Sequence, residues 1–357
     1  MFIKKAFVLA LCAVMLMGTA FAQDLPENPE EGEVEEAVEE AVEEVTSPEE
    51  DLLFKVQDRM DDMTLDQKIS QMVMPCFRYW DGQPVTDLSL FPELAEALQK
   101  HCYGGVILFG ANIVDTEQTV RLVDALQDNN ASALSWQDTK AIPYLVSADQ
   151  EGGAVARLSM GTRGTGSMAI GATGEKAEEN AYATGQMFGE ELSALGINVN
   201  LGPCLDVIPD LTDLGMSTRV FSDDPQLCAT LGLAFSRGVG ESDVITTFKH
   251  FPGAGDGSDY PTATFLTREQ LDNTGLLVFK RAIEEGAEML MTSATTFPLL
   301  DDERTMADGV TKGFYPATIS EKIVTGILRE ELCFDGVVIT DALEMDQFVT
   351  EPETGAD

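Results

Sequence analysis

The sequence predicts an α/β fold, namely a (β/α)8 TIM-type barrel in which the eighth β/α unit is missing. From about residue 52, short apolar runs rich in β-branched residues alternate with longer helix-like stretches. Strands that alternate with helices indicate a parallel sheet with right-handed crossovers. Seven such pairs follow one another, and no Gly-x-Gly-x-x-Gly motif follows the first strand. A barrel is therefore favoured over a dinucleotide-binding sheet.

Hydrophobic runs and helix-start signals place the individual elements. Strands are expected at 72–77, 104–109, 143–148, 197–202, 245–250, 288–292 and 336–340. Helices are expected at 64–71, 92–101, 116–127, 175–194, 225–239, 267–285 and 318–331. Capping boxes that begin at Thr64 and Thr267 mark the start of two of these helices. Because no eighth strand follows residue 340, we expect the chain to be truncated at its C-terminal end.

Three segments of different composition divide the chain. Residues 1–22 combine a basic start, an apolar stretch and a small-residue cleavage site, which is typical of a secretory signal peptide. Residues 23–51 hold fourteen acidic residues and no Lys or Arg, so we expect an acidic disordered linker. Residues 52–357 form the predicted barrel domain. We expect no membrane span after signal cleavage, and a protein that is secreted or associated with the cell envelope.

The charge of the chain excludes several classes of function. Asp and Glu total 62 against 22 Lys and Arg, which gives a formal net charge of −40. Such a protein repels phosphate backbones and anionic membrane surfaces, so we expect no nucleic-acid partner. Only two histidines occur, His101 and His250, which excludes a zinc site built from several histidines. We expect no metal and no cofactor.

Polar residues gather directly after the predicted strands. In a barrel of this type such residues point into one mouth at the carboxyl ends of the strands. They are Asp149-Gln150-Glu151, Asp206, Lys249-His250, Thr292-Ser293 and Asp341. Acids and amides bind sugar hydroxyls, and a carboxylate can be the nucleophile in glycoside chemistry. One acid after a strand is often only a helix cap, but so many together favour a carbohydrate site.

Five sequence blocks in a fixed order resemble glycoside hydrolase family 3, in its bacterial β-N-acetylhexosaminidase branch. The blocks lie within about residues 55–346 and are Asp149-Gln150-Glu151-Gly152-Gly153 with Arg157-Leu158, the stretch from Gly196 to Val207, Ser217-Thr218-Arg219, Lys249-His250-Phe251-Pro252-Gly253, and the block around Asp341. The Lys-His-Phe-Pro-Gly form resembles the hexosaminidase branch more than the β-glucosidase branch.

The resemblance implies roles for individual residues. Asp341 would be the nucleophile of a retaining mechanism and would form a glycosyl-enzyme. The sugar hydroxyls would be bound by Asp149, Arg157, Arg219, Lys249 and His250. The implied substrate is an N-acetylglucosamine-containing glycan, from which a terminal β-linked N-acetylhexosamine is removed. We expect the protein to act as a monomer.

The loop after Gly253 departs from the family pattern. In this branch the loop carries an Asp-x-His pair whose histidine is the general acid and base, but residues 254–264 contain no histidine. Asp256 or Asp259 could protonate the leaving oxygen if burial raises its pKa. Otherwise the enzyme acts only on good leaving groups, or the barrel is a catalytically impaired glycan-binding protein. A third hypothesis is a β-glucosidase or β-xylosidase of the same family.

Overall fold

The computed structural model describes residues 48–133, 136, 140–208, 216–253, 263–305, 310 and 312–345. The chain divides into two compact units, Met1–Lys68 and Ile69–Asp357. The expected signal peptide and residues 23–47 of the expected linker lie outside the described residues.

Two helices begin the described part of the chain. Helix α3 covers Pro48–Asp62 and starts four residues before the barrel domain was expected to begin, because proline suits the first turn of a helix. Helix α4 covers Leu65–Gln71. The predicted capping box is confirmed: Thr64 Oγ1 accepts a hydrogen bond from Gln67 N at 3.2 Å, and Gln67 Oε1 accepts one from Thr64 N at 2.7 Å.

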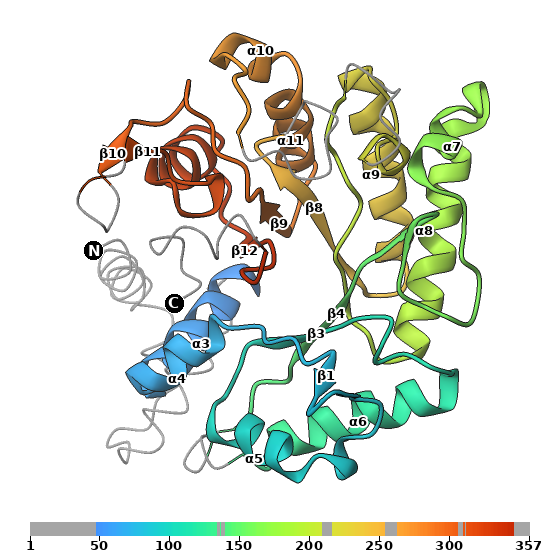
Figure 1. Cartoon of the computed structure of the whole chain (residues 1–357), viewed down its shortest axis with the longest axis vertical. Coiled ribbons are helices and arrows are strands. Elements are labelled where there is room, and N and C mark those ends of the chain that lie inside the picture. Colours follow the sequence, from blue (N-terminus) through green and yellow to red (C-terminus); the bar gives the residue numbers. More distant parts are fainter. Residues whose placement is uncertain are drawn as a thin grey trace, which may run out of the picture. The chain divides into compact units, whose positions relative to one another are not determined.

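Six parallel strands form the main sheet of the second unit (Figure 1). Their order is β12-β9-β8-β7-β4-β3, so each strand pairs with the next one of this set along the chain. They are β3 (Gly105–Leu108), β4 (Leu145–Ala148), β7 (Val199–Asn200), β8 (Ile245–Phe251), β9 (Met289–Thr292) and β12 (Val337–Thr340). Parallel strands in sequential order are the arrangement of a TIM-type barrel, as predicted.

The expected strand at 72–77 is wrong as a regular strand. Within the described residues this segment forms one isolated parallel bridge, between Cys76 and Ile107. The backbone of Ile107 also donates to the carbonyl of Pro75 at 3.2 Å. Proline has no backbone N–H to donate to the neighbouring strand, so regular pairing with β3 cannot extend through this position.

Side chains connect the segment after β12 to the segment before β3. Arg78 Nη2 lies 3.0 Å from Glu344 Oε1, and the thiol of Cys76 lies 3.6 Å from the same oxygen. The Arg78 guanidinium also lies over the ring of Phe109, 3.7 Å from its centroid. No eighth strand occurs in the described part of this unit, so the barrel is partial there.

Helices alternate with the strands and surround the sheet in Figure 1. The longer ones are α5 (Pro92–Lys100), α6 (Thr116–Ala131), α8 (Ala177–Ala194), α9 (Pro225–Gly240), α11 (Gly275–Glu284) and the π-helix η7 (Lys322–Glu331). The shorter ones are α7 (Ser167–Gly171), α10 (Arg268–Asp272) and the 3-10 turns η2 (Leu88–Leu90), η4 (Gly174–Lys176), η5 (Met216–Arg219) and η6 (Ala317–Ile319). None of the described helices is long and apolar enough to cross a membrane.

The expected helix at 267–285 is two helices, α10 and α11. Its predicted start is correct, because Thr267 forms a complete capping box with Gln270. Thr274, however, has φ −130° and ψ −101°, which is outside the helical region and separates the two helices.

Three short hairpins are present in the described part of the chain. They are β1 (Tyr79–Trp80) with β2 (Gln83–Pro84), β5 (Gln150–Gly152) with β6 (Val155–Ala156), and β10 (Arg304–Thr305) with β11 (Lys312–Gly313).

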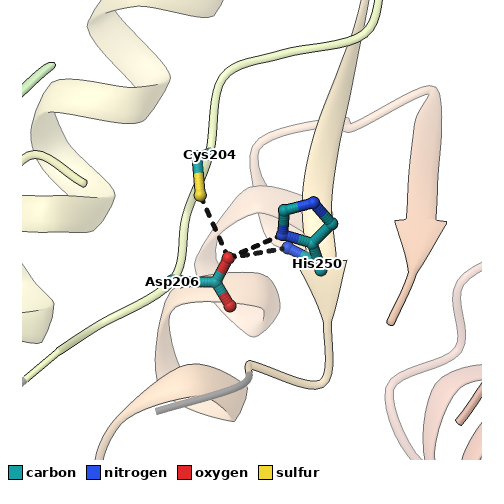
Figure 2. Close-up of side chains that lie close together, drawn as sticks. All are labelled: Cys204, Asp206 and His250. Carbon is teal, nitrogen blue, oxygen red and sulfur yellow. Dashed lines mark hydrogen bonds and ion pairs between the residues drawn. The ribbon is translucent and has the colours of Figure 1, made fainter. Parts of the chain in front are cut away.

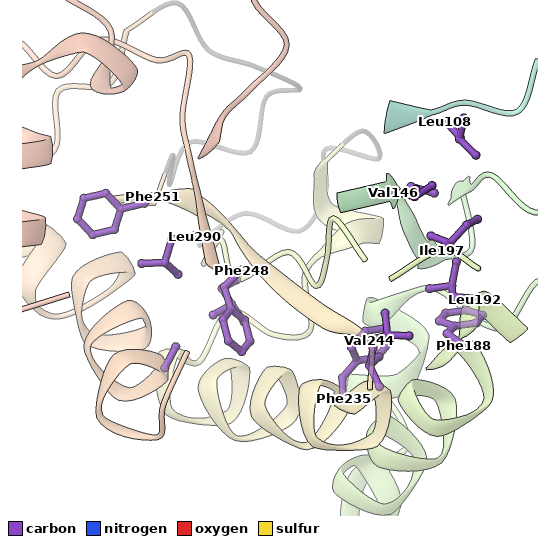
Figure 3. Close-up of a cluster of buried hydrophobic side chains, with 14 of the residues drawn as sticks. Leu108, Val146, Phe188, Leu192, Ile197, Phe235, Val244, Phe248, Phe251 and Leu290 are labelled. Carbon is purple, nitrogen blue, oxygen red and sulfur yellow. The ribbon is translucent and has the colours of Figure 1, made fainter. Parts of the chain in front are cut away.

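Two clusters of the hydrophobic core follow the alternation of side chains along each strand. The larger part lies between strands and helices and is drawn in Figure 3, where Phe248 and Leu290 from the sheet face the same layer as Phe235 from α9. A smaller cluster contains Met289 and Met291, the neighbours of Leu290 on the opposite face of β9. Both faces of the sheet are therefore buried, as expected for parallel strands.

Helices α8 and α9 pack backbone to backbone through glycines. A Cβ added at Gly185 would lie 2.0 Å from the carbonyl oxygen of Phe235, and one at Gly238 would lie 2.1 Å from that of Tyr182. No side chain fits at either position, so these glycines set how closely the two helices approach.

Candidate active site

The predicted site residues come together at the carboxyl ends of the strands. Asp149 follows β4, Lys249 and His250 lie near the end of β8, and Asp341 follows β12. The β5–β6 hairpin continues from β4 and brings Arg157 back over Asp149.

Lys249 is the centre of a buried charge network. Its Nζ lies 2.8 Å from Asp149 Oδ1 and 2.7 Å from Glu151 Oε1. All three side chains are almost completely buried. The lysine therefore bridges two carboxylates that are close in sequence and would otherwise repel each other.

Two arginines complete this network, one on each carboxylate. Arg219 binds Glu151 in a bidentate pair, with Nε–Oε2 at 2.9 Å and Nη2–Oε1 at 2.8 Å. Arg157 donates from Nη2 to Asp149 Oδ2 at 2.9 Å. Hydrogen bonds of this charged kind are stronger than neutral ones and fix orientation. The network presents Asp149, Arg157 and Lys249 in fixed positions at the barrel mouth.

The cations keep both acids ionised in spite of burial. Burial alone would raise the pKa of Asp149, but Lys249 and Arg157 outweigh it and lower the pKa to about 2. The pKa of Glu151 is likewise lowered, because Lys249 and Arg219 outweigh burial. Conversely, the two acids overcome the effect of burial on Lys249 and raise its pKa. An ionised Asp149 can accept hydrogen bonds from sugar hydroxyls.

Amide side chains hold the strands that carry these residues. Asn200 in β7 accepts a hydrogen bond from Gln150 N at 3.0 Å and donates one to Gln150 O at 3.0 Å. The side-chain oxygen of Gln150 accepts from the backbone N–H groups of Arg157, at 2.9 Å, and Leu158, at 3.2 Å. Gln150 therefore fixes the hairpin on which Arg157 is mounted.

Asp341 lies beside the histidine of β8. One carboxylate oxygen, Oδ1, accepts a hydrogen bond from Ala342 N at 2.7 Å. The other, Oδ2, is buried, has no hydrogen-bond partner among the described residues, and lies 3.8 Å from His250 Nε2. A nucleophilic carboxylate needs one oxygen that is oriented and unoccupied, and Asp341 Oδ2 fits that requirement.

A second buried cluster lies on the other side of His250 (Figure 2). Asp206 Oδ2 is 2.8 Å from His250 Nδ1, 3.0 Å from Cys204 Sγ and 3.3 Å from His250 N. Cysteine, aspartate and histidine are also zinc ligands, and these ligand atoms lie within 4.8 Å of one another. Contacts near 3 Å to one oxygen are nevertheless those of hydrogen bonds. Counting histidines alone did not anticipate this cluster.

The structure brings together most of the predicted set. Asp149, Arg157, Lys249 and Arg219 share one network, and His250 lies next to Asp341. His101, by contrast, ends α5 ahead of β3, at the amino end of the sheet. Asp256 and Asp259, the candidate acids, lie outside the described residues.

Sequence reasoning missed two contributors. Glu151 was seen only as part of a motif, although it holds both Arg219 and Lys249. Glu151 lies two residues after Asp149, and residues two apart in an extended chain point to the same side. That spacing was the signal in the sequence that could have identified it. Cys204 is a fully buried residue of the hydrophobic core, and besides packing there it donates to Asp206. Nothing local in the sequence distinguishes these two roles.

Comparisons with known proteins identify the family. Residues 64–354 match the model of the glycosyl hydrolase family 3 N-terminal domain. The chain is 36% identical over 301 residues to "Beta-hexosaminidase A" from Pseudoalteromonas piscicida, covering 79% of this chain and 49% of that protein. It is 30% identical over 264 residues to a Vibrio cholerae "Beta-hexosaminidase", covering 73% of each. The chain belongs to glycosyl hydrolase family 3.

A solved structure agrees with this assignment. The family 3 β-N-acetylglucosaminidase from Paenibacillus sp. str. FPU-7 superposes with a TM-score of 0.70 at 36% identity, over 81% of this chain and 51% of that one. The chain thus spans about half the length of the first relatives it matches.

Proposed function

We propose that the protein is a retaining glycosidase that removes terminal β-linked N-acetylhexosamine through a glycosyl-enzyme on Asp341. The proposal rests on the buried Oδ2 of Asp341, which has no hydrogen-bond partner among the described residues and lies beside a preorganised set of charged side chains. The relatives named as β-hexosaminidases support the choice of sugar.

The assigned residues divide into two groups in this proposal. Asp341 Oδ2 attacks the anomeric carbon and displaces the glycosidic oxygen, which leaves with a proton. In the second step water attacks the same carbon, displaces Asp341 and restores the original configuration. Asp149, Arg157, Lys249 and His250 bind hydroxyls of the same sugar, and Arg219 binds it from its position on Glu151. Fixed charges of this kind stabilise a charged transition state without having to reorganise during the reaction.

Proton transfer to the leaving oxygen is assigned to the loop after Gly253. Asp256 and Asp259 remain the candidate general acids, since the loop contains no histidine. Loss of general acid help lowers rates by about 10²–10⁴-fold. The protein therefore either uses one of these acids or requires activated leaving groups.

We further propose that the protein is exported, on the strength of the signal-like residues 1–22. No cofactor has a role in the proposed reaction, because a carboxylate nucleophile and a general acid suffice for it.

The test is a leaving-group series on the purified chain beginning at Gln23. Dinitrophenyl, methylumbelliferyl and natural disaccharide β-N-acetylglucosaminides are compared with the matching β-glucosides and β-xylosides, and Asp341→Ala serves as the control. Cleavage of the whole N-acetylglucosaminide series, lost in the variant, supports a complete glycosidase. If the β-glucosides or β-xylosides are cleaved in preference, the protein is instead a β-glucosidase or β-xylosidase of the same family.

The absent loop histidine favours one second candidate, a glycan-binding barrel without turnover. A folded protein whose melting temperature rises with N-acetylglucosamine, and which cleaves none of the series, would establish that alternative and overturn the hydrolase proposal.

A further inference from the structure

We infer that Asp206 is a positioning residue that fixes the proton of His250 on Nδ1, so that Nε2 alone acts at the site beside Asp341. The role of His250 in the reaction rests on the proposed function, but the position of the proton on its ring can be tested separately. It draws on the cluster in Figure 2.

One oxygen of Asp206 lies at the centre of the buried cluster. Its Oδ2 receives three contacts within hydrogen-bond distance, from His250 Nδ1 at 2.8 Å, Cys204 Sγ at 3.0 Å and the backbone N of His250 at 3.3 Å. A backbone N–H can only donate. Burial, followed by the nearby Asp206, raises the pKa of Cys204 well above its ordinary value, so the thiol keeps its proton and donates as well.

Asp206 Oδ2 can only accept a hydrogen bond from the imidazole ring of His250. An oxygen that already accepts from a thiol and from an amide holds no proton of its own. The proton between Asp206 and the imidazole ring must therefore be on Nδ1. In a histidine, the partner of one ring nitrogen decides the state of the other.

Nε2 of His250 lies on the side of the ring that faces Asp341. With Nδ1 held by Asp206, the opposite ring nitrogen points to Asp341 Oδ2 at 3.8 Å. Asp206 is completely buried and His250 nearly so, and hence the ring cannot turn over without breaking buried hydrogen bonds. Nε2 is consequently the only nitrogen of His250 that can meet a sugar hydroxyl or the nucleophile.

The experiment uses nitrogen-labelled histidine in the full mature chain, whose only histidines are His101 and His250. The spectrum therefore contains two rings, and His101→Gln identifies the second. In the unchanged protein we expect the Nδ1 of His250 to carry a proton that exchanges slowly with water. Asp206→Ala should abolish that signal, whereas Asp206→Asn, which keeps an acceptor oxygen, should retain it.

Activity gives an independent measurement. Loss of the outer partner of a metal-ligating histidine typically costs about 10- to 100-fold. We expect a similar factor for the orienting role of Asp206, so kcat/KM should fall by about that much in Asp206→Ala and less in Asp206→Asn. The double variant Asp206→Ala/His250→Ala should be no slower than His250→Ala alone, because the two residues act as one unit. Melting curves of each variant report whether it is folded.

Three results would overturn the inference. One is a wild-type spectrum with the proton on Nε2 and none on Nδ1. Another is an Asp206→Ala spectrum identical to that of the unchanged, folded protein. The third is loss of the Nδ1 proton on adding one equivalent of zinc, which would make the cluster a metal site. If no glycoside is cleaved, the proposed function fails while the spectra still decide the role of Asp206.

Discussion

Glu151 and Arg219 form a bidentate ion pair whose side chains are only 2% and 8% exposed. Removing one partner of a buried pair leaves an uncompensated charge and costs about 3–5 kcal/mol. We expect Glu151→Gln to lower the free energy of unfolding by an amount in this range, measured by urea denaturation. Glu178→Gln is the matched control, because Glu178 pairs with Arg237 at an exposed position and should cost at most about 1 kcal/mol. Equal effects would contradict this account of the network.

The fall in the free energy of unfolding at acidic pH should depend in part on Asp149. Its pKa in the folded state, about 2, lies below the ordinary value of 3.8. The ionised carboxylate therefore stabilises the fold above about pH 4, and this contribution is lost as the pH falls through about 2. The difference in unfolding free energy between the unchanged protein and Asp149→Asn should be constant from pH 7 to pH 5 and shrink toward pH 2. A difference that persists undiminished at pH 2 would be inconsistent with a lowered pKa.

The nucleophile makes a chemical prediction. Asp341→Ala should lose about 10⁴-fold or more in kcat on an activated N-acetylglucosaminide, the size of loss seen when a covalent catalyst is removed. Azide can then occupy the space of the missing carboxylate and attack the anomeric carbon. We expect added azide to restore turnover and to give a glycosyl azide of inverted configuration, identified by proton NMR. Unchanged activity in the variant would remove Asp341 from the mechanism.

Close packing of α8 and α9 predicts opposite effects for two glycine-to-alanine changes. Alanine is the better helix former by about 1 kcal/mol, so Gly326→Ala in η7, where nothing lies within 4 Å of the added carbon, should stabilise the protein slightly. At Gly185 the added carbon would lie 2.0 Å from Phe235 O. Overpacking of this kind costs about 1–3 kcal/mol, so Gly185→Ala should lower the melting temperature. If both variants were stabilised, α8 and α9 could move apart to admit the added carbon, and the packing at Gly185 would not be tight.

The contact between Arg78 and Glu344 should matter little for stability. Both side chains are about half exposed, and exposed ion pairs contribute about 0–1 kcal/mol. Glu344→Gln should therefore shift the urea midpoint only slightly, whereas a loss above about 2 kcal/mol would indicate that the pair holds the two sides of the sheet together.

Much of the fold was predictable because periodicity and strand–helix alternation are local properties. Six of the seven expected strands are present in their expected order. The failure at 72–77 came from Pro75, whose missing N–H outweighs the apolar run around it. The break at Thr274 was missed although Asn273 and Gly275 flank it, two residue types that often mark the end of a helix.

The site was predictable to the extent that strand ends converge. That rule placed Asp149, Lys249 and Asp341 in one region. It could not assign partners, because Lys249 and Asp149 are 100 residues apart and their contact depends on how the side chains pack. For the same reason the hydrogen bond from Cys204 to Asp206 was not foreseen.

The link between Arg78 and Glu344 also bears on the order in which the molecule assembles. The two residues are 266 positions apart. Closing a flexible loop of that length costs roughly 5 kcal/mol in chain entropy, which is far more than the stabilisation that an exposed ion pair contributes. The contact can therefore form only after the intervening strands have paired and shortened the distance. We therefore expect this contact to form late in folding, after β12 has paired with β9 and brought Asp341 to His250.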